Sequence, residues 1–556
     1  MLRTCLLATA MLAANQSAAA QSPPSGVGSQ LQQIPPAAVR EMPAPDIRIE
    51  RPQAAPDAVA EGVAIRVELL RVAGNTLFPE AELIAATGFT PGSELTLPEL
   101  RNAAAAIARF YNSRGYFLAQ AYLPPQDVKA GVVTIAVVEG TYGAIKLRNQ
   151  TGGSDRVAGR IMGGLRPGDP VTIAPLERRL LLLSDTPGVV VRSTLAPGTA
   201  VGTSDLTIDL APGPRISGSI EADNAGSRYT GPYRLGGSIN LNNPTGIGDL
   251  ISLRLLASTE GLAFGRLAYQ APVGDATLGV AYTHMRYQLG REFSPLDASG
   301  SADIVSVFGS YPLIRSRDSN LYIQASLDAK RLEDEIGLAS LVSSKSSRVL
   351  GVGLRGDFRD RFAGGGATSY SVALMTGELD IEDPFERAAD AATARTQGSF
   401  NKLQFSAARL QSVSGPFSLY GAVRGQIASS NLDSSEKMEL GGAYAVRAYP
   451  EGEAYGDQGY VATLEGRLML DRWTSGLPGR FQLIGFVDMG EVDFARDPWL
   501  AGPNHARRSG VGAGLAWAGP GDLFIRATYA ARLGDEPATS APDERGRAWF
   551  QVVKLF

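Results

Sequence analysis

Short segments in which apolar and polar residues alternate follow one another through residues 213–556. In LFIRATYAARL, for example, Leu523 and Tyr529 fall on one face of an extended strand, whereas Arg526 and Arg532 fall on the other. The same period of two recurs in sixteen segments with almost no helical pattern between them. An apolar face opposite a face with arginines fits a wall between lipid and a wet lumen. The pattern therefore predicts sixteen membrane-spanning β-strands.

The links between these segments alternate between short and long. NPTGIG, SRDS and GPGD are short turns, whereas EDEIGLASLVSSK and DIEDPFERAADAATARTQGS are long polar loops. Outer-membrane barrels have short turns on one side and long loops on the other, and bacterial single-chain barrels have an even number of strands. The alternative, a soluble protein of several β-sheets, has no reason to alternate its loop lengths. We therefore expect a mainly β fold, with a 16-stranded antiparallel transmembrane β-barrel over residues 213–556.

Residues 61–212 have a different pattern, which predicts two small α+β modules over residues 61–140 and 141–212. In the first module, the segments VAIRVELLRVAG, PEAELIAATG, LTLPELRNAAAAIARFYNSRGY, FLAQAYLP and GVVTIAVVEG predict the order β-α-α-β-β. In the second, TYGAIKLRN, SDRVAGRIMGGL, PLERRLLLLSDTPG, VVVRSTLAPG and SDLTIDLAPG repeat that order more loosely. The repetition favours tandem modules over two unrelated domains.

Two further segments precede the modules. Residues 1–20 contain Arg3, a short apolar run and a small-residue end, which predict a cleaved signal peptide and hence an exported protein. Residues 21–60 contain eight prolines, which predict an extended, mobile tether. Within the tether, GSQLQQI (28–34) has room for only a turn or two of helix. The pattern leaves open whether such a helix plugs the barrel.

Composition and charge exclude several classes of function. The net charge of −4 and the isoelectric point of about 5.6 argue against a nucleic-acid partner, which would require a basic patch. Past residue 20 the sequence contains no run of about 18 apolar residues, so we expect no transmembrane helix. The single cysteine, Cys5, lies in the predicted signal peptide, so the mature chain is expected to have no disulfide and no thiol chemistry.

Other motifs in the barrel region do not point to an enzyme. Gly351, Gly353 and Gly356 spell GxGxxG, but a dinucleotide site needs a helix directly afterwards, and here a strand continues. His284 and His505 have no second ligand at metal-binding spacing. No Ser-His-acid grouping supports a lipase-type barrel. We therefore expect no metal site, no cofactor and no enzymatic activity.

Four motifs resemble those of a known family, the two-partner secretion outer-membrane transporters of the haemolysin/haemagglutinin secretion-activation type. The first module resembles a polypeptide-transport-associated (POTRA) domain through its GNT turn, the helix end YNSRGY, the LPPQD segment and the closing VEG. GPYRLGGSINLNNPTGIGD resembles the early barrel hairpin of the family, GGAYAVRAYPEGEAYGDQGY its sixth external loop, and GFVDMG its thirteenth-strand motif. The resemblance extends from about residue 61 to residue 556.

The resemblance implies a site that joins this loop to this strand. The corresponding residues are Val446, Arg447, Ala448 and Tyr449 in the loop tip, and Phe486, Asp488 and Gly490 in the strand. Ala448 stands where the family has glycine, which implies a less tightly turned tip. In the family the loop folds back into the lumen and its tip arginine pairs with the strand aspartate, so we expect a salt bridge between Arg447 and Asp488. The salt bridge is also expected on physical grounds, because an unpaired charge inside a narrow barrel has a large desolvation cost.

The resemblance also implies a function. Two POTRA domains, residues 61–140 and 141–212, would lie in the periplasm and capture an unfolded exoprotein, which would then cross the outer membrane through the barrel without nucleotide energy. The partners implied are a large secreted exoprotein of adhesin or haemolysin type and outer-membrane lipid. An assembly factor that inserts other barrels is the alternative, but it would usually have more POTRA domains. A passive porin would have none.

Overall fold

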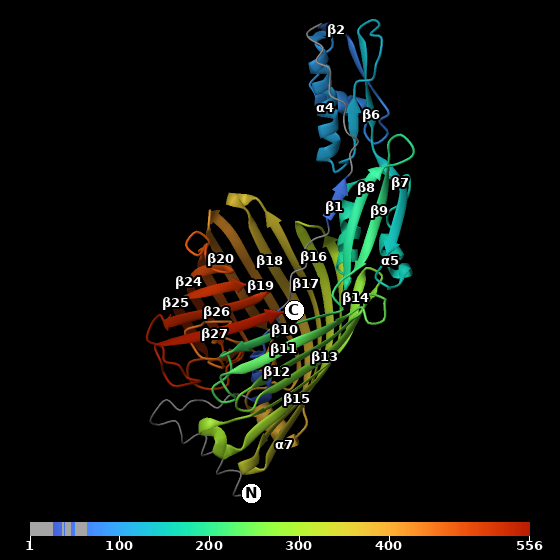
Figure 1. Ribbon diagram of the computed structural model, residues 1–556. Helices are drawn as coiled ribbons and strands as arrows, with labels where there is room; N and C mark the ends of the chain where they lie inside the picture. The colour runs from blue at the N-terminus through green and yellow to red at the C-terminus, as the bar shows by residue number, and fades with distance from the viewer. Residues whose placement is uncertain (1–25, 36–37, 39–45, 50–63) are drawn as a thin grey trace.

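The computed structural model describes residues 26–35, 38, 46–49 and 64–556 (Figure 1). The predicted signal peptide, residues 1–20, lies outside the described residues. Two α+β units, residues 64–140 and 141–212, stack one beyond the other at one end of a large β-barrel (Figure 1). Among the described residues, no helix is both long and apolar enough to cross a bilayer.

Sixteen strands close into one barrel in which every strand is antiparallel to its chain neighbour, as the alternating pattern predicts. Closure is made by five residue pairs between the first and last strands, Ser219–Asp223 against Gln551–Leu555. The strands are β10 (Ile216–Asp223), β11 (Arg234–Asn242), β12 (Leu250–Ser258), β13 (Ala263–Val273), β14 (Ala276–Gln288), β15 (Ala298–Arg315), β16 (Ser319–Ile336), β17 (Leu341–Asp360), β18 (Gly366–Ile381), β19 (Gly398–Ser414), β20 (Phe417–Ala428), β23 (Gln458–Met469), β24 (Arg480–Asp493), β25 (His505–Gly519), β26 (Leu523–Arg532) and β27 (Gly546–Leu555).

Side chains alternate between the lumen and the outside along these strands. On β14, Leu278, Val280 and Tyr282 are exposed on the outer face, whereas Ala281 and Thr283 are buried inside. This arrangement follows from the two-residue period of an extended chain, which sends successive side chains to opposite faces of the wall. The outer apolar band is the surface that lipid would cover.

Two predicted loops are structured. Residues 333–345, predicted as a loop, are mostly strand, because β16 and β17 run for 18 and 20 residues and meet at a single 3-10 turn, η2 (Gly337–Ala339). The prediction was wrong because a hairpin that projects beyond the membrane meets water on both faces and needs no apolar alternation. A second long link contains the helix α7 (Pro384–Ala392), which begins at the N-cap Asp383.

The first unit has the predicted β-α-α-β-β order with two extra short strands. Its longer helix begins with a capping box, in which Thr96 and Glu99 exchange hydrogen bonds, and it buries Leu100, Ile107 and Tyr111 against the sheet. Its elements are β2 (Ile65–Val67), β3 (Leu69–Ala73), α3 (Glu80–Thr87), β4 (Ser93–Leu95), α4 (Leu97–Ser113), β5 (Gln120–Tyr122) and β6 (Val132–Val138). The main sheet has the order β3-β6-β5.

The second unit repeats the order and contacts the barrel. Its elements are β7 (Thr141–Asn149), α5 (Asp155–Met162), α6 (Ile173–Ser184), β8 (Val189–Pro197) and β9 (Thr203–Pro212). Arg179 on α6 forms an ion pair with Asp275, and the Arg315 guanidinium binds the Asp185 carboxylate at 2.7 Å. Both barrel residues lie at short turns, so the units sit at the short-turn end of the barrel.

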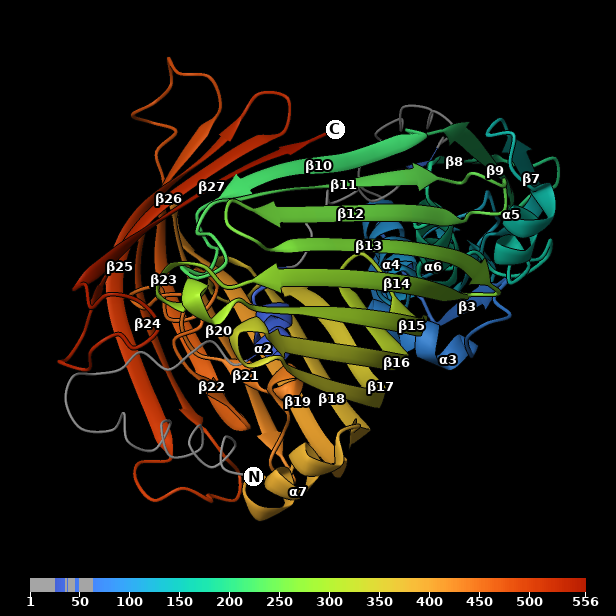
Figure 2. The same ribbon diagram turned by 90° about the horizontal axis from the view of Figure 1, so that it is seen from below.

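The segment 21–60 is not only a tether. Residues Gly26–Gln32 form the helix α2, which lies inside the barrel (Figure 2), and Asp46–Ile49 form the strand β1, which pairs with β8 of the second unit. The short helix that residues 28–34 allow is present, shifted to Gly26–Gln32, and β1 is extended as predicted, but the prediction of a mobile tether is wrong for both elements. It failed because both elements are held by contacts with parts of the protein that are distant in sequence, and local propensity carries no record of those contacts.

Candidate functional site in the barrel lumen

The connection between β20 and β23, residues 429–457, folds back into the barrel; we call it the luminal loop. It contains the turn η4 (Ser434–Glu436) and a two-residue ladder between β21 (Met438–Glu439) and β22 (Tyr455–Gly456). Its apolar side chains pack with inward-facing residues of β23, β24, β25 and β26 into one buried cluster. A polar loop can stay in this position only if its charges find partners there.

The tip of the luminal loop places Arg447 against Asp488 of β24. The Arg447 Nε donates to Asp488 Oδ2 at 2.8 Å and its Nη2 donates to Oδ1 at 2.7 Å, which makes a two-pronged ion pair. The backbone N–H of Arg447 also donates to this carboxylate, at 3.2 Å. The two side chains are 7% and 1% exposed, so the pair is shielded from water. The structure thus brings together the two residues that the family resemblance pairs.

A second carboxylate, that of Glu465, also contacts Arg447. The Arg447 Nη1 donates to Glu465 Oε1 at 2.8 Å, and the Glu465 carboxylate forms ion pairs with Arg467 at 2.7 Å and with Arg526 at 3.1 Å. Three guanidinium groups therefore face two carboxylates, Glu465 and Asp488. Such bidentate, charge-assisted contacts fix an orientation as well as an attraction. Sequence reasoning missed Glu465, although its inward position in the β23 alternation is a usable signal.

The other loop-tip residues position the arginine. Val446 and Tyr449 are fully buried, and the Tyr449 N–H donates to the Val446 carbonyl at 3.0 Å, which closes a tight turn. Ala448 is not among the described non-glycine residues with positive φ, so the turn does not require glycine there. The tip therefore closes into a tight turn with alanine in place, and a tighter turn with glycine stays a prediction.

The strand motif around Asp488 provides the surface on which the loop rests. The Phe486 ring lies beneath Arg447, with 3.5 Å between the guanidinium carbon and the ring centroid. Gly490 has the same inward orientation, and a Cβ there would lie 2.7 Å from a Leu440 methyl carbon. A side chain at position 490 would therefore crowd Leu440 of the luminal loop, while Phe486 supplies a cation–π contact.

A second ion pair ties the luminal loop to β25 and to the last long loop. Arg508 binds Glu453 at 2.8 Å, and the other oxygen of Glu453 accepts from the Thr539 N–H at 2.9 Å. Arg508 and Glu453 are 8% and 0% exposed. The spacing of these residues in the sequence gave no signal for this pair. Their contact means that the loop is held at two charged points rather than one.

Helix α2 is held in the lumen by both the wall and the luminal loop. Its first turn donates from the Val27 N–H to Asp334 of β16 at 2.7 Å. Its C-terminal end donates from Gln32 Nε2 to the Ser435 carbonyl at 2.8 Å, and the Gln33 carbonyl accepts from Arg234 of β11 at 2.9 Å. The Val27 side chain packs into a buried apolar cluster of the wall. Together, α2 and the luminal loop occupy the lumen.

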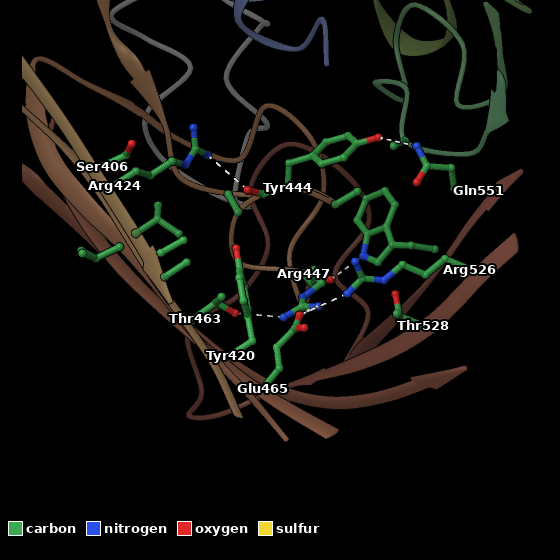
Figure 3. A pocket seen from close by; sticks show the side chains of 18 of the residues that line it. Ser406, Tyr420, Arg424, Tyr444, Arg447, Thr463, Glu465, Arg526, Thr528 and Gln551 are labelled. Atoms are coloured by element: carbon green, nitrogen blue, oxygen red, sulfur yellow. Dashed lines mark hydrogen bonds and ion pairs between the residues drawn. The ribbon is translucent and has the colours of Figure 1, made fainter. Parts of the chain in front are cut away.

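A cavity of about 390 Å³ remains between the luminal loop and the wall (Figure 3). Arg424, Arg447 and Arg526 line it, together with Glu465 and the ring of Tyr420 (Figure 3). The lining therefore includes charged side chains beside apolar ones, and the charged side chains agree with the arginine-bearing face that the strand pattern predicts. Among the described residues, no group of three or more His, Cys, Asp or Glu side chains is arranged to hold a metal ion.

In the first unit, three of the motif segments named above converge on one carboxylate, that of Glu139 in the closing VEG. Its Oε1 accepts from the Thr76 N–H at 2.7 Å, from the Leu77 N–H at 2.9 Å and from the Tyr111 hydroxyl at 2.7 Å. Burial acts to raise the pKa of Glu139, but these hydrogen bonds, with the one from the Thr76 hydroxyl, outweigh it and lower the pKa below its ordinary value of 4.5. The motif thus fixes the turn, the helix end and the last strand to each other.

These features define a class of protein: a sixteen-stranded outer-membrane barrel that has periplasmic α+β units and a long loop folded into the lumen, where ion pairs hold it to the barrel wall. The family model described as "Haemolysin secretion/activation protein ShlB/FhaC/HecB" matches residues 202–516, which is more than half of the chain. The model described as "POTRA domain, ShlB-type" matches residues 65–140. The chain therefore belongs to the ShlB/FhaC/HecB family of two-partner secretion transporters.

Similar individual proteins agree with this assignment. The chain is 28% identical over 474 residues to the heme/hemopexin transporter protein HuxB of Haemophilus influenzae, covering 84% of this chain and 82% of HuxB. It is 24% identical to the outer membrane transporter CdiB of Dickeya dadantii, covering 89% and 86%. Among solved structures, CdiB from Escherichia coli matches with a TM-score of 0.69 at 20% identity, covering 90% and 93%. The protein is an outer-membrane transporter that acts with a secreted exoprotein partner, and its POTRA region lies in the periplasm.

Proposed function

We propose that the structure represents the resting state of the transporter, in which the luminal loop and α2 together close the pore. The observation that carries this proposal is the shielded, two-pronged ion pair between Arg447 and Asp488. Breaking such a pair leaves an uncompensated buried charge, so the loop has a strong preference for its luminal position. Passage of a polypeptide would then require both α2 and the loop tip to move.

We further propose that residues 141–212 are a second POTRA domain, so that two such domains precede a barrel of residues 213–556. The repeated β-α-α-β-β order supports this division, as does the contact of the second unit with the short-turn end of the barrel. An exoprotein would meet the first unit, then the second, and then the lumen.

The exoprotein is proposed to be large, unfolded during transit, and of adhesin or haemolysin type. The family description, which refers to haemolysin secretion, supports this class. The arginine and glutamate side chains that line the cavity also support it, because such groups can form hydrogen bonds with the backbone of an extended chain. The outward apolar band of the barrel would contact outer-membrane lipid.

The test is secretion by a cell that makes the transporter together with a candidate exoprotein, namely any large exported protein that a neighbouring reading frame encodes. The natural chain should release the exoprotein into the medium, whereas a chain lacking residues 64–140 should insert a folded barrel and leave the exoprotein in the periplasm. Undiminished secretion by the deletion variant would exclude capture by the first unit. A general loss of other outer-membrane barrels, with no exoprotein defect, would favour the assembly-factor alternative.

A further inference from the structure

The strand β1 covers an edge of the second unit that would otherwise be open. Its four residues pair in parallel with β8, from Asp46 opposite Arg192 to Ile49 opposite Leu195 (Figure 1). The resulting sheet has the order β1-β8-β9-β7, so β8 would be an edge strand without β1. An uncovered edge presents a row of free backbone donors and acceptors, which pair readily with any extended chain.

The corresponding edge of the first unit is treated differently. There the strand that follows the second helix is β5, and it pairs only with β6 among the described residues. In the second unit, the strand in the same position of the repeat is β8, and it carries β1. One repeat thus has an open edge, and the other has an edge occupied by a segment of the same chain.

The chemistry of β1 shows what this edge accepts. Ile47 lies against Ser193 in the register and packs on the core of the second unit, whereas Arg48 lies opposite Thr194 and is exposed. β1 is therefore a minimal amphipathic strand, with isoleucines toward the core and an arginine toward water. Strand addition of this kind reads backbone and the alternation of side chains, not a fixed sequence.

Because of its position in the chain, β1 restrains the segment next to α2 for as long as it is paired with β8. β1 lies between α2, which occupies the lumen, and the first unit, and only ten residues separate Pro35 from Asp46. Pairing with β8 therefore fixes the chain a short distance beyond α2. Loss of the pairing would remove the contact that β1 makes with the second unit, between α2 and the first unit, which begins at Ala64 in the described structure.

We propose that β1 is a stand-in for the substrate: during secretion, an extended amphipathic segment of the exoprotein pairs with β8 in place of β1. This inference rests on the proposed function and deepens it by naming a second recognition site and the kind of segment that binds there. The exchange detaches β1, which follows α2 in the chain, from the second unit. Binding of the exoprotein segment to β8 therefore makes it easier for α2 to leave the lumen.

A disulfide lock tests the exchange in cells. The pair Arg48→Cys/Thr194→Cys places thiols on neighbouring strands, at a spacing of about 5 Å that suits a disulfide. The sequence has one cysteine, within residues 1–20, so the background is clean. The oxidised lock should lower exoprotein secretion by about tenfold or more, because the competent population becomes small, and dithiothreitol should restore it.

The matched control locks two strands of the same sheet that are not expected to separate. Arg148→Cys/Asp209→Cys joins β7 to β9, which also pair in parallel, with the two residues directly opposite. This control should secrete as well as the natural chain. If the β1 lock secretes as well as the control, then β1 has only a structural role and the proposal is overturned.

A binding measurement separates this proposal from the proposed function, because it requires no secretion. The probe is a fluorescein-labelled peptide of residues 44–51, APDIRIER, added to the purified full-length protein. A variant with Gly-Ser-Gly-Ser in place of residues 46–49 should bind it at least about tenfold more tightly than the natural chain, whose edge is occupied. A peptide with aspartates in place of both isoleucines should not bind. Equal binding to the natural chain and the variant would overturn the proposal even if secretion proceeds normally.

Discussion

Ala448 of the luminal loop lies directly against Gly510 of β25: a Cβ at position 510 would be 2.4 Å from the Ala448 Cβ. The wall is therefore shaped to admit a methyl group at the loop tip. Position 448, where the family resemblance leads us to expect glycine, has alanine, and the facing strand has glycine at position 510. The side chains at the two positions compete for the same space, although 61 residues lie between them in the sequence.

This contact predicts a defect and its rescue. Gly510→Ala should displace the loop tip, weaken the Arg447 ion pair and reduce secretion, because overpacking a tight site costs about 1–3 kcal/mol. Adding Ala448→Gly should restore the space and most of the secretion. Exoprotein in the medium measures both effects, and the mobility of unboiled protein on a denaturing gel checks that the barrel has closed. A double variant no better than Gly510→Ala would show that another contact of Gly510, such as the Ala531 carbonyl, causes the defect.

The Arg447–Asp488 pair predicts matched, non-additive defects. Removing either partner leaves the other charge buried, at a local cost of about 3–5 kcal/mol, so Arg447→Ala and Asp488→Ala should impair secretion to a similar degree. The double variant should be little worse than either single variant, since the residues act as one unit. The barrel should still insert, because its closure depends on strand pairing and not on this pair.

Arg480→Ala is the matched control for that experiment. Arg480 lies on the same strand as Asp488 and binds Asp471, but the two side chains are 65% and 50% exposed. An exposed pair of this kind contributes little, so secretion should be unchanged. Additive losses in the Arg447/Asp488 double variant would show that the two residues serve separate roles.

The alternating pattern predicted the barrel well because, in each strand, the residues that face lipid are apolar and many of those that face the lumen are polar. In β24, Phe486, Asp488 and Gly490 share the inward face, so the strand could be located from its own alternation. The site on that strand was expected only because its motif resembles that of the family. Helix α2 could not be located in this way. Its position depends on Asp334 and Ser435, which lie some three and four hundred residues further along the chain.

The ion pair between Arg508 and Glu453, which also holds the luminal loop, could not be predicted from the sequence. Arg508 follows another arginine in β25, and Glu453 lies among several charged loop residues, so neither stands out. Only the fold shows which of the two arginines faces the lumen and which carboxylate it meets. The inward or outward assignment of a charged residue near a strand end depends on where the strand leaves the membrane, and local alternation does not record that depth.

The convergence on Glu139 predicts an acid-sensitive first unit. Because its pKa is lowered on folding, the ionised carboxylate stabilises the unit above the unfolded value, and this contribution is lost as pH falls through the folded value. At neutral pH, Glu139→Gln should destabilise the unit by about 1 kcal/mol, a figure discounted because the carboxylate is partly exposed. The difference from the natural chain should narrow below pH 4.5, the ordinary value for the group.

Urea titrations of the full-length protein at neutral and acid pH test this expectation. The circular dichroism of helices reports on the α+β units, since α4, with 17 residues, is in the first unit. Glu94→Gln, at an exposed residue of β4, is the control and should leave the midpoint unchanged. A midpoint shift for Glu139→Gln that stays constant from neutral to acid pH would mean that its hydrogen bonds act independently of its charge.

The close approach of α2 to the luminal loop predicts a variant that opens the pore. A Cβ at Gly28 would lie 2.3 Å from the backbone nitrogen of Ser435, which cannot move without disturbing the whole η4 turn. Gly28→Leu should therefore expel α2 from the lumen and raise the ion conductance of the purified transporter in planar bilayers. The Arg447–Asp488 pair should keep the luminal loop in place, so the opening should be partial. Gly485→Leu is the matched control, because Gly485 has no atom within 4 Å of its Cβ position and faces outward on β24. Equal conductance in the two leucine variants would show that α2 does not limit ion flow, and would leave the luminal loop as the barrier.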